Sequence, residues 1–224
     1  MTKTIFRVVI FLAAVCFLMP KPDVFAQDSL GTAMKKGRVL LSLSSSTDAI
    51  NYYDNSINSK AIGGQTGFDL KTDAHFFLRD NFSLGGRLEL TRGETQNYVS
   101  NEEETFKVSM VFRRYFSKVS NGGLYPEVTV TYGRNIFNTQ FLQPPSPINQ
   151  SFQGNLLGGG VGVGFTYLVK QHFGIDVGLS YSFYRVFGET VDHVIDTTTK
   201  DAFTEINVSF RVGFVILLHK NTIE

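Results

Sequence analysis

Cysteine and tryptophan are almost missing from this sequence. Of its 224 residues one is Cys and none is Trp, whereas Phe and Gly each number 21. A single Cys excludes a disulfide framework, and a formal net charge of +1 argues against a dedicated nucleic-acid-binding protein. Only 18% of the residues are charged, but 13% are aromatic. A chain this aromatic can bury enough apolar surface to offset its ordering entropy, which excludes intrinsic disorder.

The first 26 residues have the pattern of a secretory signal. Lys3 and Arg7 supply the positive start, an apolar stretch follows over residues 5–19, and Val-Phe-Ala at the end suits a signal peptidase. The apolar stretch of about 15 residues is short for a retained membrane-spanning helix, which needs about 20. We therefore expect residues 1–26 to be removed with the only Cys, and residues 27–224 to form a single domain.

Long hydrophobic runs are absent from the remainder of the chain. No later segment approaches 18 consecutive apolar residues, which excludes a helical membrane protein. Alternation of apolar and polar residues with period two recurs eight times instead, as in half-buried strands. The pattern predicts strands over residues 38–46, 65–77, 82–92, 105–116, 124–134, 156–168, 173–185 and 204–218.

Alternation alone would also fit a soluble sandwich or a lipocalin, but two features favour a membrane barrel. The predicted connections alternate between long ones (47–64, 93–104, 135–155, 186–203) and short ones (78–81, 117–123, 169–172), the outer-membrane barrel arrangement. One strand face is continuously apolar and rich in Phe, whereas the other carries charges of both signs. We predict an all-β fold, an eight-stranded antiparallel up-and-down transmembrane β-barrel in the bacterial outer membrane.

The polar face is predicted to form a charge network in the lumen. Six acids and six bases fall on it: Asp69, Asp73, Glu89, Glu127, Asp176 and Glu205, with Arg38, Lys71, Arg87, Lys107, Arg113 and Arg211. Buried charges must be paired, because each ion alone costs several kcal/mol to desolvate. Near-equal numbers therefore suit a lumen filled by side chains, which is the usual state of an eight-stranded barrel.

The charges also predict the register of the first hairpin. If Phe77 pairs with Ser83, then Asp73 faces Arg87 and Lys71 faces Glu89, so both pairs join opposite charges. A slip of two residues would place Lys71 opposite Arg87, and like charges directly opposite are destabilising. We therefore predict the first register.

Small and aromatic residues complete the pattern. Glycine occupies alternate polar-face positions of the sixth predicted strand, at Gly158, Gly160, Gly162 and Gly164, which leaves room for long side chains opposite. A phosphate-binding loop is disfavoured because neither its glycine spacing nor a following helix is present.

Seven tyrosines lie near predicted strand ends and are either part of the interfacial girdles or ordinary strand aromatics: Tyr98, Tyr115, Tyr125, Tyr132, Tyr167, Tyr181 and Tyr184.

Motifs at the predicted short turns carry a family resemblance. They are Phe77-Leu78-Arg79-Asp80-Asn81-Phe82-Ser83-Leu84-Gly85-Gly86, Phe112-Arg113-Arg114-Tyr115-Phe116 with Leu124-Tyr125-Pro126-Glu127, and Gly160-Val161-Gly162-Val163-Gly164-Phe165 through Ser180-Tyr181. They resemble the bacterial outer-membrane β-barrel domain family. The resemblance implies a small OmpA/OmpX-like barrel with both termini in the periplasm, contacts with outer-membrane lipid and lipopolysaccharide, and insertion by the barrel-assembly machinery. It implies no shared active site, and the tail 220–224 departs from the terminal aromatic usual in such barrels.

Two loop features are candidates for activity. His193, beside Asp192 and near Glu189 and Asp196, could serve an outer-leaflet lipid A-modifying enzyme or capture a metal, although a solvated surface histidine is the simpler interpretation. The loop 135–155 holds Pro144, Pro145 and Pro147, flanked by Phe137, Phe141 and Phe152. It either contacts an unknown surface partner or is simply stiffened by its prolines.

We expect a non-enzymatic integral outer-membrane barrel that acts in envelope structure or surface interaction through its extracellular loops. We expect neither a cofactor nor a metal, and no nucleic-acid partner. A lipid A-modifying enzyme and a narrow channel are the alternatives.

Overall fold

The computed structural model describes residues 32–53, 65–96, 100–119, 121–141, 147–170 and 172–218. The predicted signal peptide, residues 1–26, and the tail 219–224 lie outside this range. Within the described ranges, no helix is long and apolar enough to cross a membrane.

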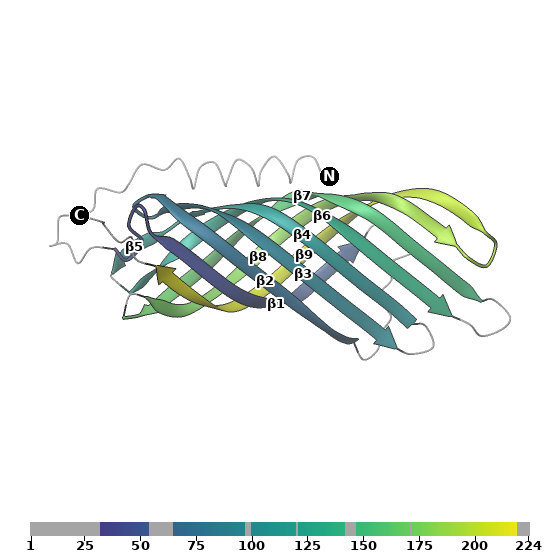
Figure 1. Cartoon of the computed structure of the whole chain (residues 1–224), viewed down its shortest axis with the longest axis horizontal. Helices are drawn as coiled ribbons and strands as arrows, with labels where there is room; N and C mark the ends of the chain where they lie inside the picture. The colour runs from purple at the N-terminus through teal and green to yellow at the C-terminus, as the bar shows by residue number, and fades with distance from the viewer. Residues whose placement is uncertain are drawn as a thin grey trace.

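The chain folds as a closed antiparallel barrel (Figure 1). The strands are β1 (Val39–Tyr53), β2 (Gln65–Arg79), β3 (Phe82–Gln96), β4 (Ser100–Arg114), β5 (Phe116–Val119), β6 (Gly122–Phe141), β7 (Ile148–Val169), β8 (Phe173–Asp192) and β9 (Thr197–Leu218). Both β4 and β5 pair with β6, so these two segments are one strand interrupted at Tyr115. Pairing of β1 with β9 closes the ring. The predicted eight-stranded up-and-down barrel is confirmed.

The register of the β2–β3 hairpin is the one predicted from its charges. Lys71 pairs with Glu89, and Asp73 pairs with Arg87. Asn81 in the connecting turn has a φ of 62°, a left-handed conformation that its short polar side chain tolerates. Charge complementarity across the strands therefore agrees with the turn geometry.

The strands run further than the alternation predicted, so much of the expected long loops is strand. The β8–β9 pairing continues to Asp192 opposite Thr197, and only residues 193–196 turn. The β6–β7 pairing likewise reaches Phe141 opposite Ile148. The alternation is lost because apolar and polar residues mix on the inner face of these extensions, as at Phe203 and Thr190, while backbone hydrogen bonds continue the ladder. The β6–β7 and β8–β9 hairpins consequently project beyond β1–β4 (Figure 1).

The outer surface of the barrel is an apolar belt. Outward side chains on every side of the ring are about half-exposed, among them Leu43, Phe68, Leu88, Val108, Val130, Val163, Leu179 and Phe214. The residues between them in sequence point inward and are mostly buried and polar. Such an inside-out distribution suits a barrel wall in contact with lipid.

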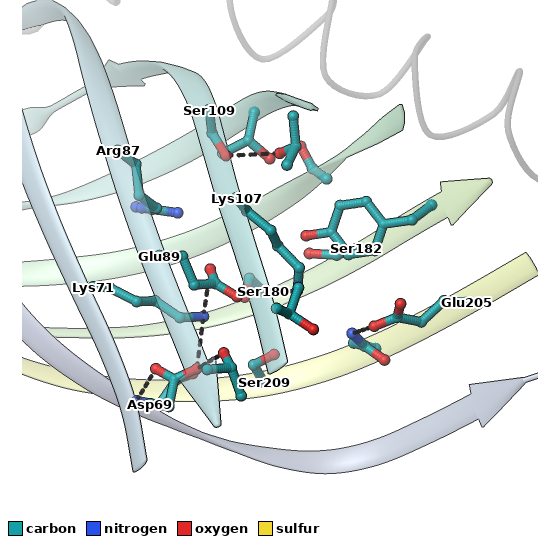
Figure 2. Close-up of a pocket in the computed structure, with 18 of the residues that line it drawn as sticks. Asp69, Lys71, Arg87, Glu89, Lys107, Ser109, Ser180, Ser182, Glu205 and Ser209 are labelled. Atoms are coloured by element: carbon teal, nitrogen blue, oxygen red, sulfur yellow. Dashed lines mark hydrogen bonds and ion pairs between the residues drawn. The ribbon is translucent and has the colours of Figure 1, made fainter. Parts of the chain in front are cut away.

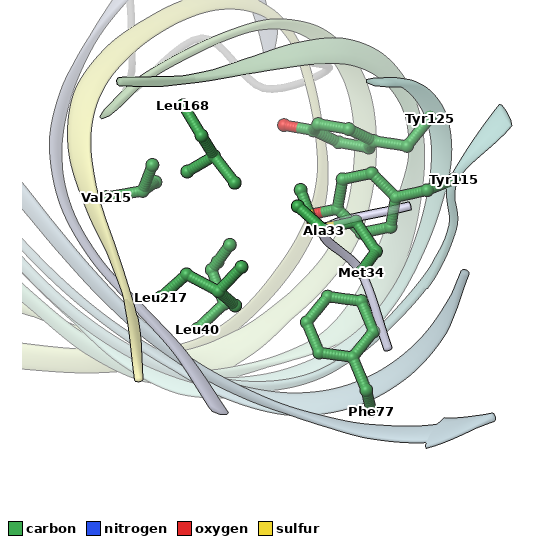
Figure 3. Close-up of a cluster of buried hydrophobic side chains, with 9 residues drawn as sticks. All are labelled: Ala33, Met34, Leu40, Phe77, Tyr115, Tyr125, Leu168, Val215 and Leu217. Atoms are coloured by element: carbon green, nitrogen blue, oxygen red, sulfur yellow. The ribbon is translucent and has the colours of Figure 1, made fainter. Parts of the chain in front are cut away.

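Apolar residues inside the barrel gather at its two ends. At the end with the short turns, here the turn end, nine side chains form the turn-end cluster (Figure 3): Ala33, Met34, Leu40, Phe77, Tyr115, Tyr125, Leu168, Val215 and Leu217. Towards the opposite end, here the loop end, the loop-end cluster comprises Phe152, Leu156, Tyr184, Val186 and Phe203, with Phe137 packed against it. The polar lumen lies between the two clusters.

The segment before β1 closes the turn end. The backbone N–H of Asn81 donates to the Met34 carbonyl at 2.7 Å, and the guanidinium of Arg38 donates to the Ala33 carbonyl at 2.8 Å. Met34 is fully buried inside the ring. Residues 32–38 therefore plug the barrel mouth, a role that their short, mixed sequence did not reveal.

Candidate functional site

Six charged side chains meet in the lumen and form the central charge cluster: Asp73, Arg87, Arg113, Glu127, Asp176 and Arg211. Arg87 donates to Asp73 at 2.7 Å and to Glu127 at 2.9 Å. Arg113 donates to Glu127 at 2.6 Å and to Asp73 at 2.9 Å, and its guanidinium lies 4.6 Å from the centre of the Tyr125 ring. Each arginine thus bridges two carboxylates, which satisfies charges that would be costly to bury alone.

The third arginine of the central charge cluster completes it. Arg211 lies 3.3 Å from Asp176 and 3.4 Å from Glu127, and it donates to the Tyr125 hydroxyl at 2.9 Å. That hydroxyl donates in turn to Asp176 at 2.7 Å. Three arginines therefore oppose three carboxylates, and Tyr125 links the cluster to the apolar residues of the turn end.

A second group of charges lies on the loop-end side of the first. Lys71 and Lys107 each lie 3.1 Å from a different oxygen of Glu89. Asp69 is 4.0 Å from Lys71 and accepts hydrogen bonds from the Ser46 backbone and the Thr91 hydroxyl, both at 3.1 Å. Each carboxylate oxygen of Glu89 is thus paired with one lysine.

The last two predicted lumen charges lie apart from these pairs. Glu205 is 3% exposed and accepts a hydrogen bond at 2.6 Å from the side-chain amide of Asn207. Arg38 lies at the turn end, where it donates to the Ala33 and Leu218 carbonyls. The fold therefore places the twelve predicted charges inside the ring, but it separates Arg38 from the rest.

A cavity of about 570 Å³ occupies the lumen on the loop-end side of the central charge cluster (Figure 2). Its wall is polar and includes both lysines, Glu89, Glu205 and the hydroxyls of Ser109, Ser180, Ser182 and Ser209. The lining reaches Gly67, Gly93 and Glu103 near the loop end. The expected filling by side chains is thus uneven: the turn-end half is packed, and the loop-end half is hollow.

Tyrosines contribute to the inner wall as well as to the outer one. Tyr115, Tyr125 and Tyr184 are buried in the lumen, whereas Tyr132 and Tyr167 are about half-exposed on the outside. The alternative that these tyrosines belong to the interfacial girdles is therefore wrong for Tyr115, Tyr125 and Tyr184. Tyr98 lies outside the described residues. The sequence did contain a signal for the inward position of Tyr125. Tyr125 lies two residues before the inward-facing Glu127 on the same strand, so both side chains share the charged face.

Alternate glycines of β7 make room for this interior. A Cβ at Gly164 would collide with the Tyr125 ring, which is held by two hydrogen bonds, and would lie 2.7 Å from the Val177 carbonyl. At Gly86 a Cβ would meet nothing within 4 Å.

We expect Gly164→Ala to lower the free energy of unfolding by about 1–3 kcal/mol, because overpacking forces the tyrosine from its site. The matched change Gly86→Ala should stay within about 0.5 kcal/mol of the wild type. Urea unfolding in lipid vesicles, followed by circular dichroism, measures both. Equal stabilities of the two variants would contradict the packing role of Gly164.

The loop-end histidine has a defined neighbour. The Nε2 atom of His193 lies 2.9 Å from the hydroxyl of Ser151. Asp192 accepts hydrogen bonds from the Gln150 side chain at 2.9 Å and from the Val194 N–H at 2.9 Å, and these bonds lower the pKa of its carboxyl. Among the described residues, no group of three or more His, Cys, Asp or Glu side chains is arranged to hold a metal ion. The fold thus does not bring Asp192, His193 and Asp196 together as metal ligands.

Two of the three phenylalanines that flank the proline-containing segment are turned inward, whereas Pro147 is exposed. Phe152 is 4% exposed because it points into the barrel, where its ring lies 5.4 Å from that of Phe203. Phe137 packs against the same loop-end cluster. These two rings are consequently unavailable as an exposed contact surface, and residues 142–146 lie outside the described part of the chain.

Known structures share this architecture. OprG from Pseudomonas aeruginosa matches with a TM-score of 0.55 and 10% identity, over 84% of this chain and 100% of that one. A major outer membrane protein from Thermus thermophilus matches with a TM-score of 0.53 and 14% identity, over 81% of this chain and 99% of that one. This chain has the fold of the small, OmpA/OmpX-like outer-membrane β-barrels.

A third structure points the same way. Outer membrane protein AlkL, determined in lipid bilayers, matches with a TM-score of 0.51 and 14% identity, over 90% of this chain and 99% of that one. No protein-family model and no curated protein sequence matches significantly. At these identities the likeness is one of fold, and the fold agrees with the apolar belt seen in the structure itself.

Proposed function

We propose that the protein is a non-enzymatic integral outer-membrane barrel, oriented with its turn end in the periplasm, that acts in envelope structure or surface interaction through its loop end. The observation that carries the proposal is the sealed turn-end half of the lumen. The central charge cluster fills the ring, and the turn-end cluster with its plug lies beneath it. The projecting β6–β7 and β8–β9 hairpins supply the surface for contact with lipopolysaccharide or a surface partner.

A closed lumen predicts the outcome of conductance measurements. Reconstituted protein in a planar bilayer should give no stable, discrete conductance steps, because Arg113, Tyr115 and Tyr125 block the ring while almost fully buried. A variant with residues 32–38 deleted serves as a comparison, since it removes Ala33 and Met34 but leaves Arg113, Tyr115 and Tyr125 in the ring. Discrete steps from the wild-type protein would contradict the proposal and favour a narrow channel.

Lipid modification is the second candidate, and the contact between Ser151 and His193 favours it. A serine within hydrogen-bond reach of a histidine is the arrangement of an activated nucleophile. The third group that orients such a histidine is not supplied by Asp192, whose oxygens accept from Gln150, Val194 and Ile195. The pair therefore fits a surface hydrogen bond better than an acyl-transfer site.

Mass spectrometry of lipid A separates these two functions. Strains that lack or overproduce the protein should contain lipid A with unchanged acylation. A change in acylation that disappears in both His193→Ala and Ser151→Ala variants would overturn the non-enzymatic assignment.

A further inference from the structure

We propose that the luminal cavity beside Glu205 and Asn207 binds a small monovalent cation of the ammonium class, that is, a primary amine carrying N–H donors. The site goes beyond the envelope role, because it lies inside the barrel and not on the projecting hairpins. It rests on a local charge imbalance, on two unsatisfied acceptors, and on an acidic approach from the loop end.

The charge imbalance follows from where the fold puts each ion. The central charge cluster pairs three carboxylates with three arginines. On its loop-end side, Asp69, Glu89 and Glu205 face only Lys71 and Lys107 among the described residues, because Arg38 is held at the turn end. Three carboxylates and two ammonium groups leave this compartment with one excess negative charge.

Glu205 is the carboxylate of this compartment that has no ion-pair partner at bonding distance within the described ranges. The ammonium of Lys107 interacts electrostatically with Glu205. It lies 3.1 Å from Glu89, however, and sits over the ring of Tyr184 at 4.8 Å from the ring centre. Lys71 is shared between Glu89 and Asp69. Both lysines are thus engaged with other groups, and the excess charge resides at Glu205.

Two buried oxygens on successive inward positions of β9 lack donors. Glu205 Oε2 and Asn207 Oδ1 have no hydrogen-bond partner among the described residues, although the two side chains are only 3% and 5% exposed. The Asn207 side-chain amide donates to the other Glu205 oxygen, the bond drawn at Glu205 in Figure 2, so the two atoms without a partner are both acceptors. Buried acceptors in native proteins are normally paired, which calls for a donor in the cavity.

The cavity decides the class of donor. A volume of about 570 Å³ is much larger than a bare metal ion needs, and its wall includes Ser209 on the same strand as Glu205 and Ser180 and Ser182 on the neighbouring strand β8. An ammonium group donates up to three hydrogen bonds, and these fit a carboxylate, an amide oxygen and a hydroxyl. The remaining space accommodates a short hydroxylated chain.

The rim at the loop end favours entry of cations. Glu103 lines the cavity mouth from the inward face of β4, whereas Glu94, Glu102 and Glu104 alternate with the inward residues and lie at the same end on the outer face. Arg92 is the basic residue among them, and it lies 2.7 Å from Glu102. Among the described residues, acidic side chains thus outnumber basic ones at this rim, which raises the local concentration of cations.

Titrations of the full-length mature protein in detergent micelles test the proposal. Methylammonium and ethanolammonium chlorides are added at pH 7.5, and the side-chain amide resonance of Asn207 is followed by NMR. Saturable shifts are expected for both amines. Choline, which has no N–H donor, serves as the negative ligand, and potassium chloride serves as the inorganic one.

Glu205→Gln is the decisive variant, because it removes the charge and keeps the shape. It should weaken amine binding at least tenfold while the barrel remains folded, since it disrupts none of the ion pairs described above. Glu103→Gln at the mouth is the matched control and should retain the affinity at high salt. No saturable shift in the wild type, equal binding by Glu205→Gln, or saturation by potassium and choline but not by the amines would overturn the proposal.

Discussion

Replacing Arg113 by Met is expected to lower the free energy of unfolding by about 3–5 kcal/mol. Arg113 is fully buried, and its guanidinium donates to Glu127 at 2.6 Å and to Asp73 at 2.9 Å. Methionine keeps the length and packing of the side chain but leaves two carboxylates short of a counter-charge in a water-poor ring. The sequence has no Trp, so urea unfolding is followed by circular dichroism and by the gel mobility of the folded barrel.

The control for Arg113 is an ion pair of the same chemistry at the loop-end rim. Arg92 lies 2.7 Å from Glu102, but its side chain is 52% exposed. Solvent screens such a pair, so Arg92→Met should cost less than about 1 kcal/mol. Comparable losses for the two variants would show that the central charge cluster is hydrated in solution and does not seal the lumen.

Placing an arginine at Leu179 is expected to destabilise the barrel by about 2–4 kcal/mol in a lipid bilayer. Leu179 points outward from β8 and is half-exposed in the isolated chain. It lies near the middle of the apolar belt, because six residues from the strand start rise about 15 Å in a tilted strand. An arginine there must either leave its charge in hydrocarbon or thin the membrane around it.

The comparison site for Leu179 is Ile195 in the β8–β9 turn. Ile195 is 67% exposed and lies beyond the belt. The same substitution there should change the free energy of unfolding by less than about 1 kcal/mol, because the side chain meets water. Transfer of both proteins from bilayer to a short-chain detergent should narrow the difference. A larger loss at Ile195 than at Leu179 would show that the belt has been placed at the wrong height.

Alternation along the chain was sufficient to predict the architecture. Phe68 and Asp69 are neighbours in sequence and must point to opposite faces of any strand, so the two faces could be read without knowing the partners. The charges of Lys71, Asp73, Arg87 and Glu89 then restricted the register of one hairpin, because a slip would have opposed like charges. Strand ends were predicted less well, since the β8–β9 ladder continues where its side chains no longer alternate.

The sequence by itself determined the inside-out barrel, because a period of two residues and the sign of a charge are local properties. Only the tertiary structure decided which charges meet. Six acids and six bases looked balanced along the chain, but closure of the ring puts Arg38 at the turn end and Glu205 above the central charge cluster. The same closure turns Tyr125 and the segment 32–38 into a seal and leaves a cavity on the other side. Which charged side chains meet in the lumen depends on the stagger of the strands around the barrel and on the residues that face them from other strands. Neither can be read from any one segment of the sequence.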